Sequence, residues 1–196
     1  MLEFRQASRW LSGWASSVSE SPRGRFGWDV GHPPQLLIDF LEENPPGRAI
    51  DLGCGTGTNA IAMAEYGWQV WGIDFVPEAI RLGKKKAKKA GVDIDLRVGD
   101  VTKSNILKDQ FDLAIDIGCY HSLSPNSRSL YRENLANILT PGGIFLIYGH
   151  DRPVEQKPPG MTEADIEAFG NHMDLITRED ASSYRGRPSF WLQYRK

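Results

Sequence analysis

The sequence predicts a three-layer α/β fold: a mostly parallel, seven-stranded sheet with helices on both faces and a C-terminal antiparallel hairpin. Two observations support it. Short apolar strand-like segments alternate with amphipathic helical segments as far as residue 149, a pattern typical of parallel sheets. After that residue the alternation stops, and two strand-like segments flank a turn-prone stretch at 184–188, which indicates a hairpin.

The expected elements follow one another through short connections. Helices are predicted at 33–43, 59–66, 78–90, 127–139 and 162–170, and strands at 48–52, 69–73, 94–98, 111–117, 144–148, 173–178 and 189–195. Pro77 favours a helix start and Gly91 a helix end. Thr162, with Asp165 three residues later, resembles a capping box. The Pro-Gly-Gly sequence at 141–143 is expected to separate a helix from the strand that follows it.

Length and composition narrow the class of protein. The chain has 196 residues, of which 40% are hydrophobic and 24% charged, which suits one globular domain. A net charge of −2 gives no reason to expect a nucleic-acid partner, and the lysine run at 84–89 is interpreted as a solvated helix face. No apolar run suits membrane insertion. The two cysteines have no metal-type spacing, so we expect a cytoplasmic protein without a metal.

The first 25 residues are predicted to form a helical arm or lid, and residues 26–196 the main domain. Apolar side chains fall at helical spacing in the first segment, with arginines and serines between them. An arm packed on the domain is favoured, and a transit peptide or a membrane-surface helix are the alternatives. Glu3 and Glu20 count against a transit peptide. The sequence leaves the oligomeric state open.

A glycine-rich loop carries the main functional signal. Gly53, Gly55 and Gly57 follow a predicted strand and precede a helix, where glycine allows a tight turn and close approach of a ligand. A dinucleotide-binding loop would have the spacing G-x-G-x-x-G, which differs from the G-x-G-x-G spacing here. Asp51 just before the loop would repel a pyrophosphate and suits an ammonium and a sulfonium. The loop therefore favours S-adenosylmethionine over NAD.

Acidic residues also follow the next two strands. Asp74 ends the strand at 69–73 and can accept hydrogen bonds from ribose hydroxyls, as acids at this place do in dinucleotide folds. Asp100 follows the strand at 94–98 and can accept a hydrogen bond from the amine of an adenine. Either acid could instead cap a turn or a helix, and Asp51 could be a structural acid that holds the loop.

Taken in order, these motifs resemble the class I S-adenosylmethionine-dependent methyltransferase family over residues 28–196. Residues 51–57 match its first motif, 116–121 its fourth-strand motif beside the methyl group, and 139–143 the turn before strand five. The resemblance implies a Rossmann-like sheet of strand order 3-2-1-4-5-7-6 and S-adenosyl-L-methionine as cofactor. The expected cofactor-binding residues are Trp28, Asp51, Gly53, Gly55, Gly57, Asn59, Asp74, Phe75, Asp100, Val101 and Asp116.

The segment Trp-Asp-x-Gly-x-Pro-Pro at 28–34 is similar to small-molecule methyltransferases, including thiopurine, thiol, halide and tellurite enzymes. The resemblance implies that this segment helps to cover the cofactor. Trp28 would then lie near its methionine part, where a ring face favours a sulfonium. The alternative is a core tryptophan that holds the arm against the domain.

The acceptor is expected beside strands four and five. Tyr120, His121, Tyr148 and His150 are the expected substrate-binding residues. His121 is the candidate general base, since an ordinary histidine titrates near neutral pH, and a structural or substrate-shaping role is the alternative. The leading hypothesis is an enzyme that methylates a sulfur, oxygen, nitrogen or halide nucleophile of a small molecule. A non-catalytic S-adenosylmethionine-binding regulatory module and a nicotinamide-dependent oxidoreductase are the alternatives.

Overall fold

The computed structural model describes residues 29–103, 109–152, 160–182 and 186–196. The predicted arm at 1–25 and Trp28 lie outside the described residues, so both remain predictions. Within the described ranges, no helix is long and apolar enough to cross a lipid bilayer.

The strands form a single sheet with the order β3-β2-β1-β4-β5-β7-β6. They are β1 (Arg48–Leu52), β2 (Gln69–Asp74), β3 (Ile94–Val98), β4 (Phe111–Ile117), β5 (Leu139–His150), β6 (Asp174–Ser182) and β7 (Pro188–Arg195). β1 to β5 pair in parallel, whereas β7 runs antiparallel to both of its neighbours. This arrangement confirms the predicted fold class and the strand order that the resemblance implies.

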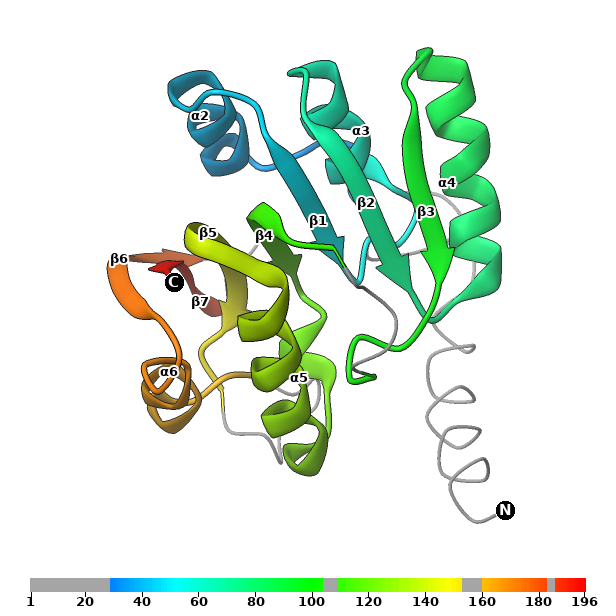
Figure 1. Cartoon of the computed structure of the whole chain (residues 1–196). Coiled ribbons are helices and arrows are strands. Elements are labelled where there is room, and N and C mark those ends of the chain that lie inside the picture. Colours follow the sequence, from blue (N-terminus) through cyan, green and yellow to red (C-terminus); the bar gives the residue numbers. More distant parts are fainter. Residues whose placement is uncertain (1–28, 104–108, 153–159, 183–185) are drawn as a thin grey trace.

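Helices cover both faces of the sheet (Figure 1). α2 (Gln35–Glu43), α3 (Thr58–Glu65) and α4 (Pro77–Ala90) lie on one face, and α5 (Pro125–Ile138) and α6 (Glu163–Phe169) on the other. Neighbouring strand residues serve opposite faces, because side chains alternate along a strand. Ala49 packs with the first group of helices and Ile50 with the second. The central strands are therefore apolar on both sides, as expected of a covered parallel sheet.

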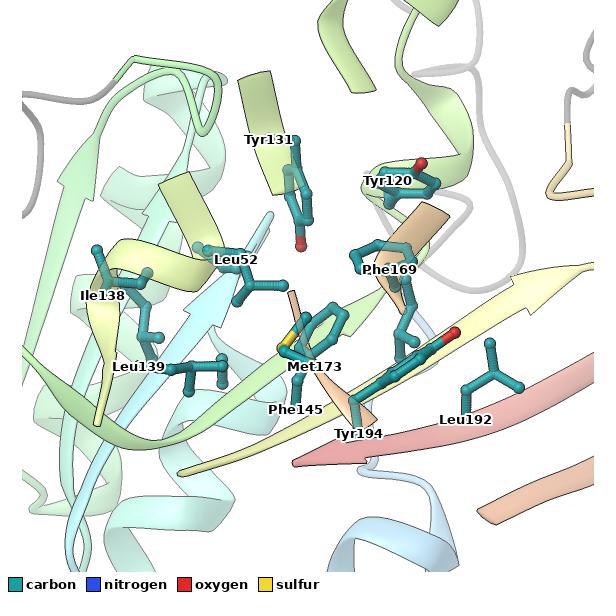
Figure 2. Packing of buried hydrophobic residues seen from close by; sticks show 14 of the residues in the cluster. Leu52, Tyr120, Tyr131, Ile138, Leu139, Phe145, Phe169, Met173, Leu192 and Tyr194 are labelled. Atoms are coloured by element: carbon teal, nitrogen blue, oxygen red, sulfur yellow. The ribbon is translucent and has the colours of Figure 1, made fainter. Parts of the chain in front are cut away.

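Aromatic side chains fill the core beneath α6 (Figure 2). Phe169 of α6 lies 5.6 Å from Phe145 of β5 and 5.3 Å from Tyr194 of β7, measured between ring centroids. All three side chains are fully buried. Ring pairs at these distances add to the stabilisation from burial alone, so this cluster fixes the terminal hairpin and α6 against the central strands.

β5 begins earlier than the sequence suggests. It starts at Leu139 and includes the Pro-Gly-Gly sequence that we expected to be a turn before the strand. The pairing of β4 with β5 shifts from Phe111 opposite Leu139 to Leu113 opposite Ile144, so the extra residues form an irregular, bulged stretch. The backbone of Lys196 accepts a hydrogen bond from Gly142 N and donates one to Gly143 O. The chain terminus thus supplies partners that the local sequence does not reveal.

Candidate functional site

The glycine loop joins β1 to α3 in a conformation that requires glycine. Gly53, Gly55 and Gly57 have φ angles of 78°, 53° and 77°, in the left-handed region. Gly53 also faces the turn after β4 so closely that a Cβ atom there would overlap the side chain of Cys119. The loop therefore lies directly beside the carboxyl end of β4, as the predicted site requires.

Asp74, at the end of β2, fixes this loop. Its carboxylate accepts hydrogen bonds from Gly55 N and from Val76 N, each at 2.8 Å. Burial raises its pKa, while these two hydrogen bonds oppose the rise. A carboxylate oxygen can accept more than one hydrogen bond, so this structural role is compatible with the expected contact to ribose.

Asp100 forms a local turn at the end of β3. Its Oδ1 accepts hydrogen bonds from the backbone nitrogen and the hydroxyl of Thr102 at 2.9 and 2.6 Å. The turn-forming alternative is therefore realised in this structure, and the expected adenine contact stays a prediction. Val101 next to it is partly buried against the core. Phe75 is 47% exposed and Asn59 partly exposed near the start of α3, so both remain available to a ligand.

Asp51 is a buried acid that the protein only partly satisfies. Its side chain is 1% exposed, and its Oδ2 atom has no hydrogen-bond partner among the described residues. Burial and the nearby charges of Asp116 and Asp74 raise its pKa well above the usual range. An unpartnered buried carboxylate oxygen is costly. A cationic group bound at the glycine loop would remove this cost, which fits a ligand carrying an ammonium or a sulfonium.

Asp116, at the end of β4, is buried and fully engaged. One oxygen accepts hydrogen bonds from the Tyr131 hydroxyl and the Tyr120 backbone, at 2.7 and 2.9 Å, and the other from Cys119 N at 2.8 Å. Burial raises its pKa to about 6 despite these bonds. These hydrogen bonds hold the turn after β4. Asp116 would stabilise a bound cation through its negative charge, and not through a hydrogen bond.

Three of the residues expected to bind the acceptor lie together where the turn after β4 meets the end of β5. The His121 ring lies 5.1 Å from that of His150 on β5, and Tyr148 lies 5.6 Å from His150, between centroids. The structure places Tyr120 elsewhere. Its side chain is fully buried against Tyr131 and Phe169, so it is a core residue with no surface for a substrate.

Burial makes His121 a poor base. Burial, then the neighbouring charges of His150 and Arg128, lower its pKa to about 3. The imidazole is consequently neutral near pH 7, but a group of such low basicity gives little driving force for proton abstraction at that pH. The expected role as general base has no support from this environment, whereas the substrate-shaping alternative is compatible with it.

Two networks of charged residues were not predicted from the sequence. In the first, the Arg128 guanidinium donates to Asp165 at 2.6 Å and to the backbone oxygens of His121 and Gly160 at 3.0 and 2.8 Å. This almost completely buried arginine joins α5, α6 and the turn that carries His121. No local signal predicts it, because its partners come from three separate segments of the chain.

The second network ties residue 29 to the glycine loop. Asp29 accepts hydrogen bonds from Lys86 at 2.8 Å, from Thr58 at 3.1 Å and from the Thr56 hydroxyl. Lys86 also donates to Thr56 at 2.6 Å. At least this lysine of the 84–89 run is therefore engaged with the site rather than simply solvated. The segment Trp-Asp-x-Gly-x-Pro-Pro at 28–34 could have predicted a role for Asp29, but only Trp28 was predicted to belong to the site.

Comparison with known proteins gives a consistent result. Residues 49–143 match the model of a family described as "Methyltransferase domain". An uncharacterized methyltransferase of Schizosaccharomyces pombe is 35% identical over 114 residues, which cover 57% of this chain and 74% of the relative.

Two further relatives have named acceptors. A 2-heptyl-1-hydroxyquinolin-4(1H)-one methyltransferase of Mycobacteroides abscessus is 26% identical over 72% of this chain and 63% of its own length. A probable thiol methyltransferase of Arabidopsis thaliana is 27% identical over 76% of this chain and 65% of its own length. The chain thus spans just under two thirds of these two relatives.

Among solved structures, the N-methyltransferase NodS of Bradyrhizobium japonicum, in complex with S-adenosyl-L-homocysteine, has the same fold. It superposes with a TM-score of 0.78 at 16% identity, and the match covers 94% of this chain and 97% of NodS.

The buried arginine leads to a first prediction. Arg128→Ala should lower the free energy of unfolding by about 3–5 kcal/mol, because it leaves Asp165 and three backbone oxygens without their buried partner. Arg97→Ala is the matched control, since Arg97 pairs with Asp95 where both side chains are roughly half exposed, and should cost less than about 1 kcal/mol. Urea titration followed by circular dichroism measures both. Equal, small losses would contradict the proposed importance of the network.

Proposed function

The chain belongs to the S-adenosylmethionine-dependent methyltransferases, and on this premise we propose that it methylates a small-molecule acceptor. The observation that carries the proposal is the buried Asp51 oxygen before the glycine loop, which has no hydrogen-bond partner among the described residues. The group formed by His121, Tyr148 and His150 supports the choice of acceptor. A buried carboxylate suits a cationic methyl donor, and a neighbouring group of rings suits an organic acceptor. The names of the quinolone and thiol methyltransferases support a small organic acceptor. We also propose a cytoplasmic location, which accords with two free thiols.

Each part of the cofactor has a candidate partner in the chain. We assign the ammonium to Asp51, the ribose hydroxyls to Asp74, and the adenine to Asp100 and Val101. Gly53, Gly55 and Gly57 would let the backbone approach the ligand, with Asn59 and Phe75 at the margin. Asp116 would contribute negative charge from below the turn, and Trp28 remains a predicted cover. These assignments place anionic groups around a ligand that carries two positive centres.

The chemistry of the transfer makes modest demands on the protein. When bound, S-adenosylmethionine supplies an electrophilic methyl group on a sulfonium. The chain must hold the acceptor in line with that methyl group and exclude water. We propose that His121, Tyr148 and His150 position the acceptor. The Arg128 guanidinium supports this role because it donates a hydrogen bond to the backbone oxygen of His121.

The function is tested by calorimetric titration with S-adenosylmethionine, S-adenosylhomocysteine and NAD in parallel, followed by turnover assays with thiols, phenols, amines and halides. We expect micromolar binding of both adenosyl ligands, no binding of NAD, and release of S-adenosylhomocysteine with at least one acceptor. Binding without turnover of any acceptor would favour a regulatory module. Binding of NAD alone would overturn the proposal.

Asp74→Ala should weaken S-adenosylmethionine binding by about 1–3 kcal/mol, because a buried charged acceptor is lost. Asp74→Asn, which keeps one acceptor oxygen, should lose less. Asp95→Ala on the neighbouring strand is the control, since Asp95 is roughly half exposed and pairs with Arg97. The S-adenosylmethionine affinity of this variant should equal that of the unmodified protein. Unchanged affinity in Asp74→Ala, measured by calorimetry, would remove the ribose assignment.

Binding of the cofactor should also depend on pH. Burial raises the pKa of Asp116 to about 6 and that of Asp51 well above its usual range. Protons on these acids compete with a bound cation, so affinity should fall as the pH decreases from 7 to 5, by up to about tenfold per pH unit for each proton released. S-adenosylhomocysteine keeps the ammonium that we assign to Asp51, so its affinity should fall in the same direction. Calorimetry across this range checks the prediction, and an affinity of S-adenosylmethionine that stays constant from pH 7 to pH 5 would contradict it.

A further inference from the structure

Two partly buried imidazoles meet at the carboxyl ends of β4 and β5. The rings of His121 and His150 are inclined by 33° with their centroids 5.1 Å apart. The Nδ1 atom of each is buried and has no hydrogen-bond partner among the described residues. Buried polar atoms are normally paired. Two unpaired Nδ1 atoms on neighbouring rings therefore indicate a binding site in which a ligand forms hydrogen bonds with the imidazoles.

Aromatic rings continue this group across the sheet. Tyr148 meets His150 edge-on at 5.6 Å and lies 5.1 Å from Trp191, which is opposite it on β7. Tyr148 and His150 are two residues apart on one strand, so their side chains share a face. Tyr148, His150 and Trp191 are only partly buried. Partly exposed rings beside unpartnered imidazoles suit a flat, conjugated molecule with one polar edge.

Besides burial and the effect of one ring on the other, arginines lower the pKa values of the two imidazoles. Burial, then His150 and Arg128, lower the pKa of His121 to about 3, and burial, then Arg187 and Arg152, lower the pKa of His150. Tyr148 lies beside His150, and burial raises the pKa of the Cys119 thiol, two residues before His121. A neutral imidazole carries one N–H donor. Near neutral pH the two neutral imidazoles thus offer donors, and neither ring is basic enough to take a proton readily.

We propose that the acceptor is an aromatic molecule whose nucleophile is an acidic hydroxyl or thiol that reacts as its anion, with His121 and His150 donating hydrogen bonds to it. The inference rests on the proposed function and names its substrate class. In the reaction, a lone pair of the aromatic oxygen or sulfur anion forms the new bond to the methyl carbon. The carbon–sulfonium bond breaks, and its electron pair remains on the sulfur as a thioether. One anion and one cation become two neutral groups, so no proton is transferred.

Binding of 4-nitrophenol to the protein saturated with S-adenosylhomocysteine tests the inference directly, because the absorption spectrum distinguishes phenol from phenolate. We expect the bound probe to be phenolate at a pH where much of the free probe is still protonated, that is, with a lowered probe pKa. A bound probe that stays protonated would overturn the inference. So would failure of the probe to bind while S-adenosylhomocysteine binds. If neither ligand binds, it is the proposed function that fails.

Variants identify the donors. His121→Phe and His150→Phe should each weaken phenolate binding about tenfold or more, as expected for a lost hydrogen bond to a charge, and should raise the pKa of the bound probe. His121→Asn and His150→Asn keep an N–H donor and should recover part of the loss. His172→Asn is the control, because His172 is exposed in the turn before β6. S-adenosylhomocysteine affinity should stay constant throughout, and unaltered phenolate binding in both phenylalanine variants would overturn the inference.

Turnover provides a second measurement. With a series of phenols of different acidity, the acidic limb of the kcat/KM profile should move with the pKa of each free phenol, because the enzyme selects the anion. A limb fixed at one pH for every phenol would reveal a base on the protein and contradict the inference. Preference for benzyl alcohol or aliphatic amines over phenols and thiophenol would do the same, while leaving the proposed function intact.

Discussion

Three carboxylates are buried at the ends of the adjacent strands β2, β1 and β4, and the rest of the site is arranged around their desolvation. Asp74 and Asp116 satisfy their oxygens with backbone N–H groups, and in doing so they fix the glycine loop and the turn after β4. Asp51 lies between them, and one of its oxygens has no hydrogen-bond partner in the part of the chain that the structure describes. Because burial of an unpaired carboxylate oxygen is costly, this acid is the one that we assign to a cationic ligand.

The distribution of charge differs between the place that we propose for the cofactor and the place that we propose for the acceptor. Negative charge is concentrated beside the glycine loop, where the acids follow β1, β2 and β4. Arginines instead surround the imidazole pair beyond β4 and β5. Such a gradient favours a cation on one side and an anion on the other. It also explains why His121 and His150 remain neutral, since each is partly buried and lies near arginines that lower its pKa.

Sequence patterns located the glycine loop, its acids and the neighbouring strands, because each of these signals is local. Each acid lies at or just beyond the end of its own strand in the sequence, and the parallel sheet brings these strand ends to one edge. The same approach misjudged Tyr120, which follows the right strand but points into the core beside Phe169. Orientation around a short turn depends on neighbours from α5 and α6 that sequence proximity does not specify.

The sequence alone determined the order of elements, the parallel sheet with its terminal hairpin, and the chemical type of the cofactor. Hydrophobic periodicity and glycine spacing predict these features because both patterns involve residues that are close in the sequence. Only the tertiary structure decided which groups meet across it. The Arg128–Asp165 pair, the Asp29–Lys86 link and the contact of His121 with His150 join residues separated by 37, 57 and 29 positions. Burial lowers the pKa of His121 and leaves one oxygen of Asp51 without a hydrogen-bond partner among the described residues. It arises only when those distant segments pack together.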